Sequence, residues 1–163
     1  MSERWVLNAS PLIVLAQIGR EDLFSLAEQV VIPRDVVDEI QAGPEDDRAL
    51  KLLQAGKFKI VESRTPPLEI LAWDLGAGES AVLSFAIAES GWTSILDDAL
   101  ARKCAQSFSI SVRGTLGIVL LAKQRGMIPS AAEVVRALRD TGFRLDDQVV
   151  RDAVASVGEE WAV

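Results

Sequence analysis

The sequence predicts an α/β fold with a mainly parallel central sheet flanked by helices. Short apolar runs of strand length alternate with longer segments whose apolar residues recur every three or four positions, which is typical of this class. The 163 residues, with a hydrophobic content of 49%, suit one domain with a sizeable core. No linker is long enough to divide the chain, so we expect a single domain over residues 1–163.

Five short runs of apolar and β-branched residues are the predicted strands. They are residues 5–7, 30–32, 58–61, 93–96 and 109–112. The run at 30–32, Val-Val-Ile, has no polar position, as expected of a strand that is buried on both faces.

The predicted helices of the first half lie at residues 11–18, 21–28, 33–40 and 48–55. Ser10 is the expected N-cap of the first helix, because Pro11 then occupies the first helical position, and Gly19 ends the pattern. Pro33 begins the third helix, whose apolar residues are spaced for one face.

The predicted helices of the second half lie at residues 79–89, 97–106, 115–123, 129–143 and 146–157. A Gly-Ala-Gly turn precedes the first of them, and Gly91 ends it. The last two belong to a C-terminal helical extension, residues 129–163. Their apolar spacing suits packing on the domain or on a second protomer, and we expect a homodimer.

The absence of histidine narrows the possible chemistry more than any other feature. It excludes Ser-His-Asp and Cys-His catalysis as well as histidine ligation of metals. Cys104 is the only cysteine, so the chain can form no internal disulfide, and we expect this residue to be buried on a helix. No signal-peptide pattern and no apolar run of about 18 residues is present, so we expect a cytoplasmic protein outside the membrane.

The net charge of −7 is unevenly distributed along the chain. Acidic residues dominate residues 21–98, whereas residues 99–144 contain eight basic and only two acidic side chains. The acidic part could supply a cation site, and the basic part could contact phosphate. Both could equally be solvated helix faces.

Several polar residues are expected at the carboxyl ends of strands or in the helices that follow, where open parallel sheets bind ligands. They are Asn8, Glu39, Glu79, Asp97 and Asp98. Carboxylates that share a cleft repel one another unless a cation binds between them. Oxygen ligands favour Mg²⁺ or Mn²⁺, which can activate water for phosphodiester hydrolysis without histidine.

Each of these residues also has a purely structural interpretation. Asp97 or Asp98 could cap a helix, and Glu79 would interact favourably with a helix dipole. Glu39 could be a surface charge, and Asn8 could hold a turn.

Five segments in the same order resemble PIN-like proteins, in particular the group named domain of unknown function 3368. They are Asn8–Ile13, Ile32–Ile40, Leu75–Ala81, Leu96–Arg102 and Gly114–Gly126, within residues 5–128. The resemblance implies a three-layer PIN-like sandwich and an Mg²⁺- or Mn²⁺-dependent ribonuclease, a type often found as the toxin of a toxin–antitoxin pair.

By position, the resemblance implies that Glu39, Glu79 and either Asp97 or Asp98 are metal ligands and catalytic residues. Asn8 occupies the first acidic position of the family, where most active members have Asp. Asparagine retains an oxygen ligand but lacks the negative charge. The resemblance also implies that Ser10 supports the site by hydrogen bonding and that Thr115 lines it.

Two hypotheses follow. The first is an endoribonuclease in which Arg102, Lys103 and Arg113 position the RNA strand. The second is a PIN-like module with a weakened site that binds RNA or protein, such as an antitoxin, without cleavage. A phosphoacceptor domain is a third possibility, suggested by the Asp97-Asp98 pair, but the sequence lacks the ordered Asp, Ser/Thr and Lys residues of that class.

Overall fold

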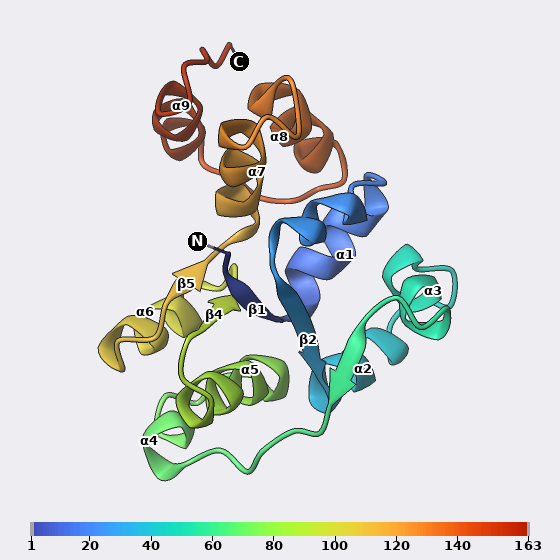
Figure 1. Cartoon of the computed structure of the whole chain (residues 1–163), viewed down its shortest axis with the longest axis vertical. Coiled ribbons are helices and arrows are strands. Elements are labelled where there is room, and N and C mark those ends of the chain that lie inside the picture. The colour runs from blue at the N-terminus through green and yellow to red at the C-terminus, as the bar shows by residue number, and fades with distance from the viewer. Residues whose placement is uncertain (1, 163) are drawn as a thin grey trace.

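The protein is built around a five-stranded sheet in which every neighbouring pair of strands is parallel, in the order β3-β2-β1-β4-β5 (Figure 1). The computed structural model describes residues 2–162. The strands are β1 (Arg4–Leu7), β2 (Gln29–Pro33), β3 (Lys59–Val61), β4 (Trp92–Ile95) and β5 (Val112–Arg113). The predicted α/β class with its parallel sheet is confirmed.

Helices cover the sheet on both sides and make a three-layer sandwich. They are α1 (Ala9–Gln17), the 3₁₀ helix η1 (Glu21–Leu26), α2 (Arg34–Gln41), α3 (Arg48–Gln54), α4 (Leu68–Leu71), α5 (Ala77–Ala88), α6 (Ala99–Ser107), α7 (Thr115–Gln124), α8 (Ala131–Asp140) and α9 (Asp147–Ala155). Figure 1 shows α1 and α7 on one side of the strands and α4 and α5 on the other. Helix α5 contacts β1, β2 and β4 directly.

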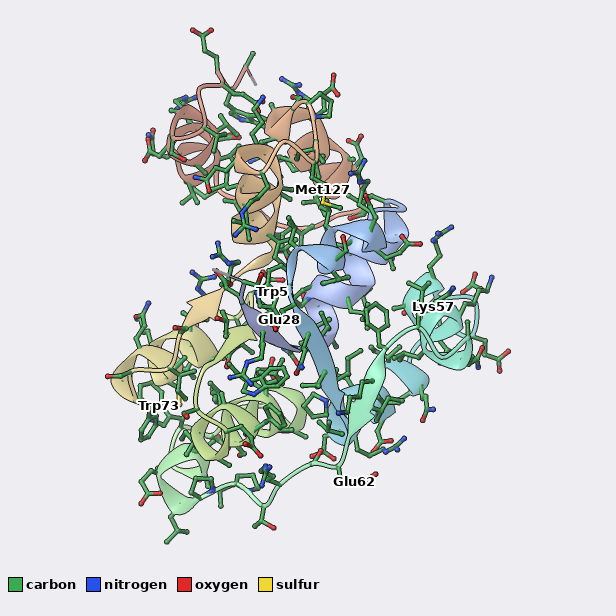
Figure 2. All side chains as sticks on the ribbon, in the orientation of Figure 1. Trp5, Glu28, Lys57, Glu62, Trp73 and Met127 are labelled. Atoms are coloured by element: carbon green, nitrogen blue, oxygen red, sulfur yellow. The ribbon has the colours of Figure 1, made fainter. Side chains whose placement is uncertain are left out.

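The central strand β1 lies at the middle of the core. Trp5, Val6 and Leu7 are completely buried, because both faces of the strand are covered by helices. The Trp5 ring, labelled near the centre of Figure 2, packs edge-to-face on Phe24 with 6.5 Å between ring centroids. The site described below begins at the carboxyl end of this buried strand.

Some predicted element boundaries are wrong. Helix α1 begins at Ala9 with Asn8 at the N-cap position, so Ser10 does not cap it. Pro11 is tolerated as the third helical residue because the first N–H groups of a helix have no partner within it. Ser109 has a left-handed φ of 56°, which is incompatible with a strand, so β5 begins only at Val112. The single-turn helix α4 was not predicted.

The C-terminal helices pack on the rest of the chain through α7. Helix α8 contacts α7, and α9 contacts both α7 and α8. Val135, Leu138, Val150 and Val154 are fully buried in these contacts. The apolar spacing predicted for this segment is therefore satisfied within the chain itself. Within residues 2–162, no helix has the length and apolar character needed to cross a membrane.

Candidate metal centre

The strand order reverses between β1 and β4, and the predicted site residues lie at this point. From β1 the chain continues outward to β2 and β3, and then returns to β4 on the other side of β1. At their carboxyl ends, Leu7 of β1 pairs with Ile95 of β4, and the Asn8 N–H donates to the Ile95 carbonyl at 3.2 Å. Ligands of open α/β sheets bind outside the strand ends at such a reversal. Asn8 and Asp97 follow these two strands.

Asn8 has a buried amide oxygen that accepts no hydrogen bond. The residue is 3% exposed, and its Oδ1 atom has no partner among the described residues. The first turn of α5 approaches it closely at Gly78: a Cβ atom there would lie 2.8 Å from Asn8 Oδ1 and 3.7 Å from Glu39 Oε1. Gly78 therefore allows a close approach that no side chain would permit. An unpartnered buried acceptor is costly unless something binds it.

Glu39 and Glu79 form a pair of interacting carboxylates on helices α2 and α5, which contact each other. Partial burial raises the pKa of the Glu39 carboxyl above its ordinary value, and the charge of Glu79 raises it further. The Glu79 side chain folds back over Gly76, where a Cβ atom would lie 2.6 Å from Glu79 Oε2. The two carboxylates therefore repel each other.

Asp97 is held by three hydrogen bonds from residues far away in the sequence. The Ser10 hydroxyl donates to Oδ2 at 3.0 Å, and Thr115 donates twice, from its N–H to Oδ1 and from its hydroxyl to Oδ2, each at 2.7 Å. Thr115 is completely buried at the N-terminus of α7. The carboxylate is thus held by Ser10, which the resemblance implied would support the site by hydrogen bonding, and by Thr115, which it implied would line the site.

Asp98 points to a different partner. It is the N-cap of α6, and its Oδ2 atom accepts a hydrogen bond from the Ala101 N–H at 2.9 Å. The capping interpretation therefore applies to Asp98, whereas Asp97 contacts Ser10 and Thr115. The sequence alone could not decide which of these two adjacent carboxylates caps the helix and which lies at the strand end.

The three predicted nucleic-acid-binding residues differ in how freely they can contact a ligand. Arg113 is paired with Glu3, and this pairing holds its guanidinium in place. Burial alone would raise the pKa of Glu3, but hydrogen bonds from Arg113 and Trp5 lower it below its ordinary value. Arg102 donates only to the Leu96 carbonyl, and exposed Lys103 forms no ion pair within residues 2–162.

The comparison with known families agrees with this geometry. A family model for domain of unknown function 3368, described as a PIN domain, matches residues 4–159. The chain belongs to this PIN domain family. The matched range continues beyond the sequence motifs, which end near residue 128, and includes α8 and α9. No curated protein matches the chain in sequence. PIN domains have a nuclease-like fold and generally depend on divalent metal ions.

The donor set of this PIN domain fits a hard divalent cation. Asn8, Glu79 and Asp97 line one cavity of about 1140 Å³, and Glu39 borders the neighbouring hollow on the other side. Within residues 2–162, no three Asp, Glu, His or Cys side chains approach closely enough to form a metal site alone. The buried Oδ1 atom of Asn8 has no hydrogen-bond partner among the described residues, and it is an oxygen of the kind that a hard divalent cation prefers.

Sequence reasoning missed two glycines that shape the site. Gly78 permits the contact of α5 with Asn8. Gly114 lies against Asp97, whose Oδ1 would be 3.1 Å from a Cβ atom at that position. Both glycines stand in the motifs quoted above, so the signal was present, but only the folded structure shows which atoms they approach.

Proposed function

We propose that this PIN domain is a metal-dependent endoribonuclease that uses Mg²⁺ or Mn²⁺. Asn8, Glu39, Glu79 and Asp97 would hold the ion, and Asp98 would orient helix α6 as its N-cap. The buried, unpartnered Oδ1 atom of Asn8 carries this proposal. It lies close to Glu39, whose pKa is raised by burial and further by the charge of Glu79, and a cation would relieve both unfavourable features.

Bound at this site, a divalent ion would supply an activated water molecule and charge neutralisation at the scissile phosphate. The residues of the chain have separate tasks. Ser10 and Thr115 orient Asp97, so that its carboxylate does not need to reorganise. Arg102 and Lys103, in the lining of the same cavity, would bind the phosphates beside the cleaved bond.

The second candidate function is a PIN domain that binds RNA or protein but cleaves weakly or not at all. The neutral side chain at position 8 favours this alternative, because it removes one negative charge from the donor set. Cleavage of a labelled single-stranded RNA in Mn²⁺ by the native protein, Asn8→Asp and Glu79→Ala distinguishes the two. A nuclease site predicts cleavage that increases in Asn8→Asp and disappears in Glu79→Ala. No cleavage by either the native protein or Asn8→Asp would favour the binding module.

We also propose that the protein is cytoplasmic and acts as a homodimer, and that it is the toxin of a pair with an antitoxin protein. Membership of the PIN family supports the toxin role, and the exposed apolar side chains of Leu68 and Leu71 on α4 support an association surface. Light scattering of the purified chain tests the dimer. Co-expression with the protein encoded by the adjacent gene tests the antitoxin, since a genuine pair should co-purify.

A further inference from the structure

We propose that the connection between α8 and α9, residues 141–146, forms a base-binding wall beside the metal centre, with Phe143 stacking on a nucleobase and Arg144 contacting the strand. These residues would restrict the groove to an unpaired polynucleotide strand. The inference depends on the proposed function for the kind of ligand, and it extends that function by assigning strand selection to the C-terminal helices.

The α8–α9 connection and the metal-centre residues border the same cavity. Its lining includes Asn8 and Asp97 at the strand ends, and also the whole of residues 141–145. These two parts lie more than 40 residues apart in sequence, and the packing of α8 and α9 on α7 brings them together. A strand that fills this cavity from Asp97 would contact the α8–α9 connection.

The cavity lining also includes apolar side chains. Among them are Leu116 and Leu120 of α7, with Phe143, Leu145 and Val149. Phe143 is half-buried, and Val149 is 52% exposed although it is a large apolar residue. A half-buried aromatic ring beside half-buried leucines and the exposed Val149 offers a surface on which a nucleobase stacks, without preference for one base.

Three cations that form no ion pair within residues 2–162 border the cavity. Arg102 and Lys103 project from α6, and Arg144 lies in the α8–α9 connection. Within residues 2–162 none of the three forms an ion pair, in contrast to Arg113 in the same lining, which pairs with Glu3. These three local cations complement a polyanion, even though the net charge of −7 on the chain as a whole opposes such binding at long range.

The wall is held in a defined shape rather than being a free loop. Arg139 at the end of α8 forms an ion pair with Asp147 at 2.7 Å and donates to the Leu145 carbonyl, and so it ties α8, the connection and α9 together. Gly142 has a φ of 93° and donates to the Arg139 carbonyl at 2.9 Å, which ends the helix in a left-handed residue. Phe143 and Arg144 are therefore presented from a fixed backbone.

The geometry favours a single strand over a duplex. Bases within an A-form duplex are paired and stacked on each other, so their faces cannot reach Phe143. An unpaired base can place its face on the ring while its phosphates contact Arg144 or the α6 cations. Selection would thus arise from stacking rather than from hydrogen bonds to base edges.

The test is fluorescence anisotropy with a fluorescein-labelled single-stranded oligouridylate and with the same label on an RNA duplex, in a chelator so that no metal contributes. We expect tighter binding of the single strand. Phe143→Leu should weaken it at least about fivefold, because stacking is lost, and Phe143→Trp should retain it. Arg144→Ala should reduce the salt dependence of binding by about one charge, whereas Arg151→Ala, an exposed change on α9 outside the cavity lining, should not.

Thermal melts of each variant separate lost binding from lost folding, and Phe143→Leu preserves most of the apolar volume for this reason. Single-strand binding that is unchanged in both Phe143→Leu and Arg144→Ala, equal affinity for the duplex, or no binding by the native protein would overturn the proposal. Unchanged binding together with metal-dependent cleavage would overturn this wall and leave the nuclease intact. Binding that depends on Phe143 without cleavage in Mn²⁺ would support the wall and contradict the nuclease.

Discussion

Replacing Asn8 by aspartate tests whether the site is a crowded cation pocket, because the change adds a charge and almost no volume. The side chain is 3% exposed, and its oxygen lies near the end of Glu39, whose pKa is already raised by burial and by Glu79. An unpaired carboxylate at such a position costs several kcal/mol if it stays ionised. For Asn8→Asp without metal at pH 7, we expect a loss of about 3 kcal/mol in the free energy of unfolding.

A loss of this size corresponds to a decrease of roughly 6–12 °C in the melting temperature of a chain of this length. Differential scanning fluorimetry in chelator and in Mn²⁺ measures it. Mn²⁺ at about a hundred times its dissociation constant for Asn8→Asp should raise the free energy of unfolding of this variant by about 2.7 kcal/mol. The same Mn²⁺ concentration should stabilise the native protein less. The loss should shrink as the pH falls toward about 4 and vanish well below it, where the added carboxyl is neutral in both the folded and unfolded states.

Asn8→Ala is the matched control, because it removes the same side chain without adding a group that titrates. The Asn8 side chain makes no capping hydrogen bond to α1, so this control loses no helix cap. The difference in stability between Asn8→Ala and the native protein should not show the dependence on pH and on Mn²⁺ that is expected for Asn8→Asp. An Asn8→Asp protein as stable as the native one in chelator, with equal stabilisation of both by Mn²⁺, would refute the reasoning.

Three further predictions concern the groups around the site and the C-terminal segment. Thr115→Val removes the 2.7 Å hydrogen bond from the Thr115 hydroxyl to Asp97 and should lower the free energy of unfolding in urea by about 1.5–3 kcal/mol. In an Asp97→Ala background the same substitution should lower it by less than about 0.5 kcal/mol. Equal losses in the two backgrounds would contradict a direct interaction. Glu39 has a raised pKa in the folded protein, so in chelator it destabilises the fold as the pH rises above about 4.5. Glu39→Gln should therefore gain stability over the native protein between pH 4 and pH 7, whereas Asp38→Asn on the same helix should not. Burial alone would raise the pKa of Glu159, but hydrogen bonds from two N–H groups of α8 lower it. Glu159→Gln should therefore be less stable than the native protein at pH 7, and the difference should shrink as the pH falls through the lowered pKa; a difference that does not change with pH would argue against this cause.

The sequence was sufficient to predict the centre of the sheet because β1 and β2 are largely buried on both faces and therefore contain continuous apolar runs. The run Val-Val-Ile at 30–32 lies inside β2, and the alternation with helices predicted that neighbouring strands are parallel. Boundaries were predicted less well where one residue decides them. The left-handed backbone of Ser109 and the single turn of α4 have no periodic sequence pattern from which they could be predicted.

The sequence predicted only those site residues that lie at strand ends or in the recognised motifs. Asn8 and Asp97 were expected near each other because parallel strands place their carboxyl ends on one edge. The assignment of Asp98 to a helix cap depends on side-chain rotamers, and the pairing of Arg113 with Glu3 joins residues 110 positions apart. Neither contact has a periodic or short-range signal. The α8–α9 connection joined the site only through tertiary packing.

Calorimetric titration of the protein with Mn²⁺ and with Mg²⁺ tests the central claim most directly. The native protein, Glu79→Ala and Glu69→Ala should be compared, since Glu69 is an exposed glutamate on α4 that lies outside the site. We predict millimolar or tighter binding by the native protein and by Glu69→Ala, and its loss in Glu79→Ala. Absence of binding in all three proteins, or equal binding in all three, would contradict a metal centre built on Asn8, Glu39, Glu79 and Asp97.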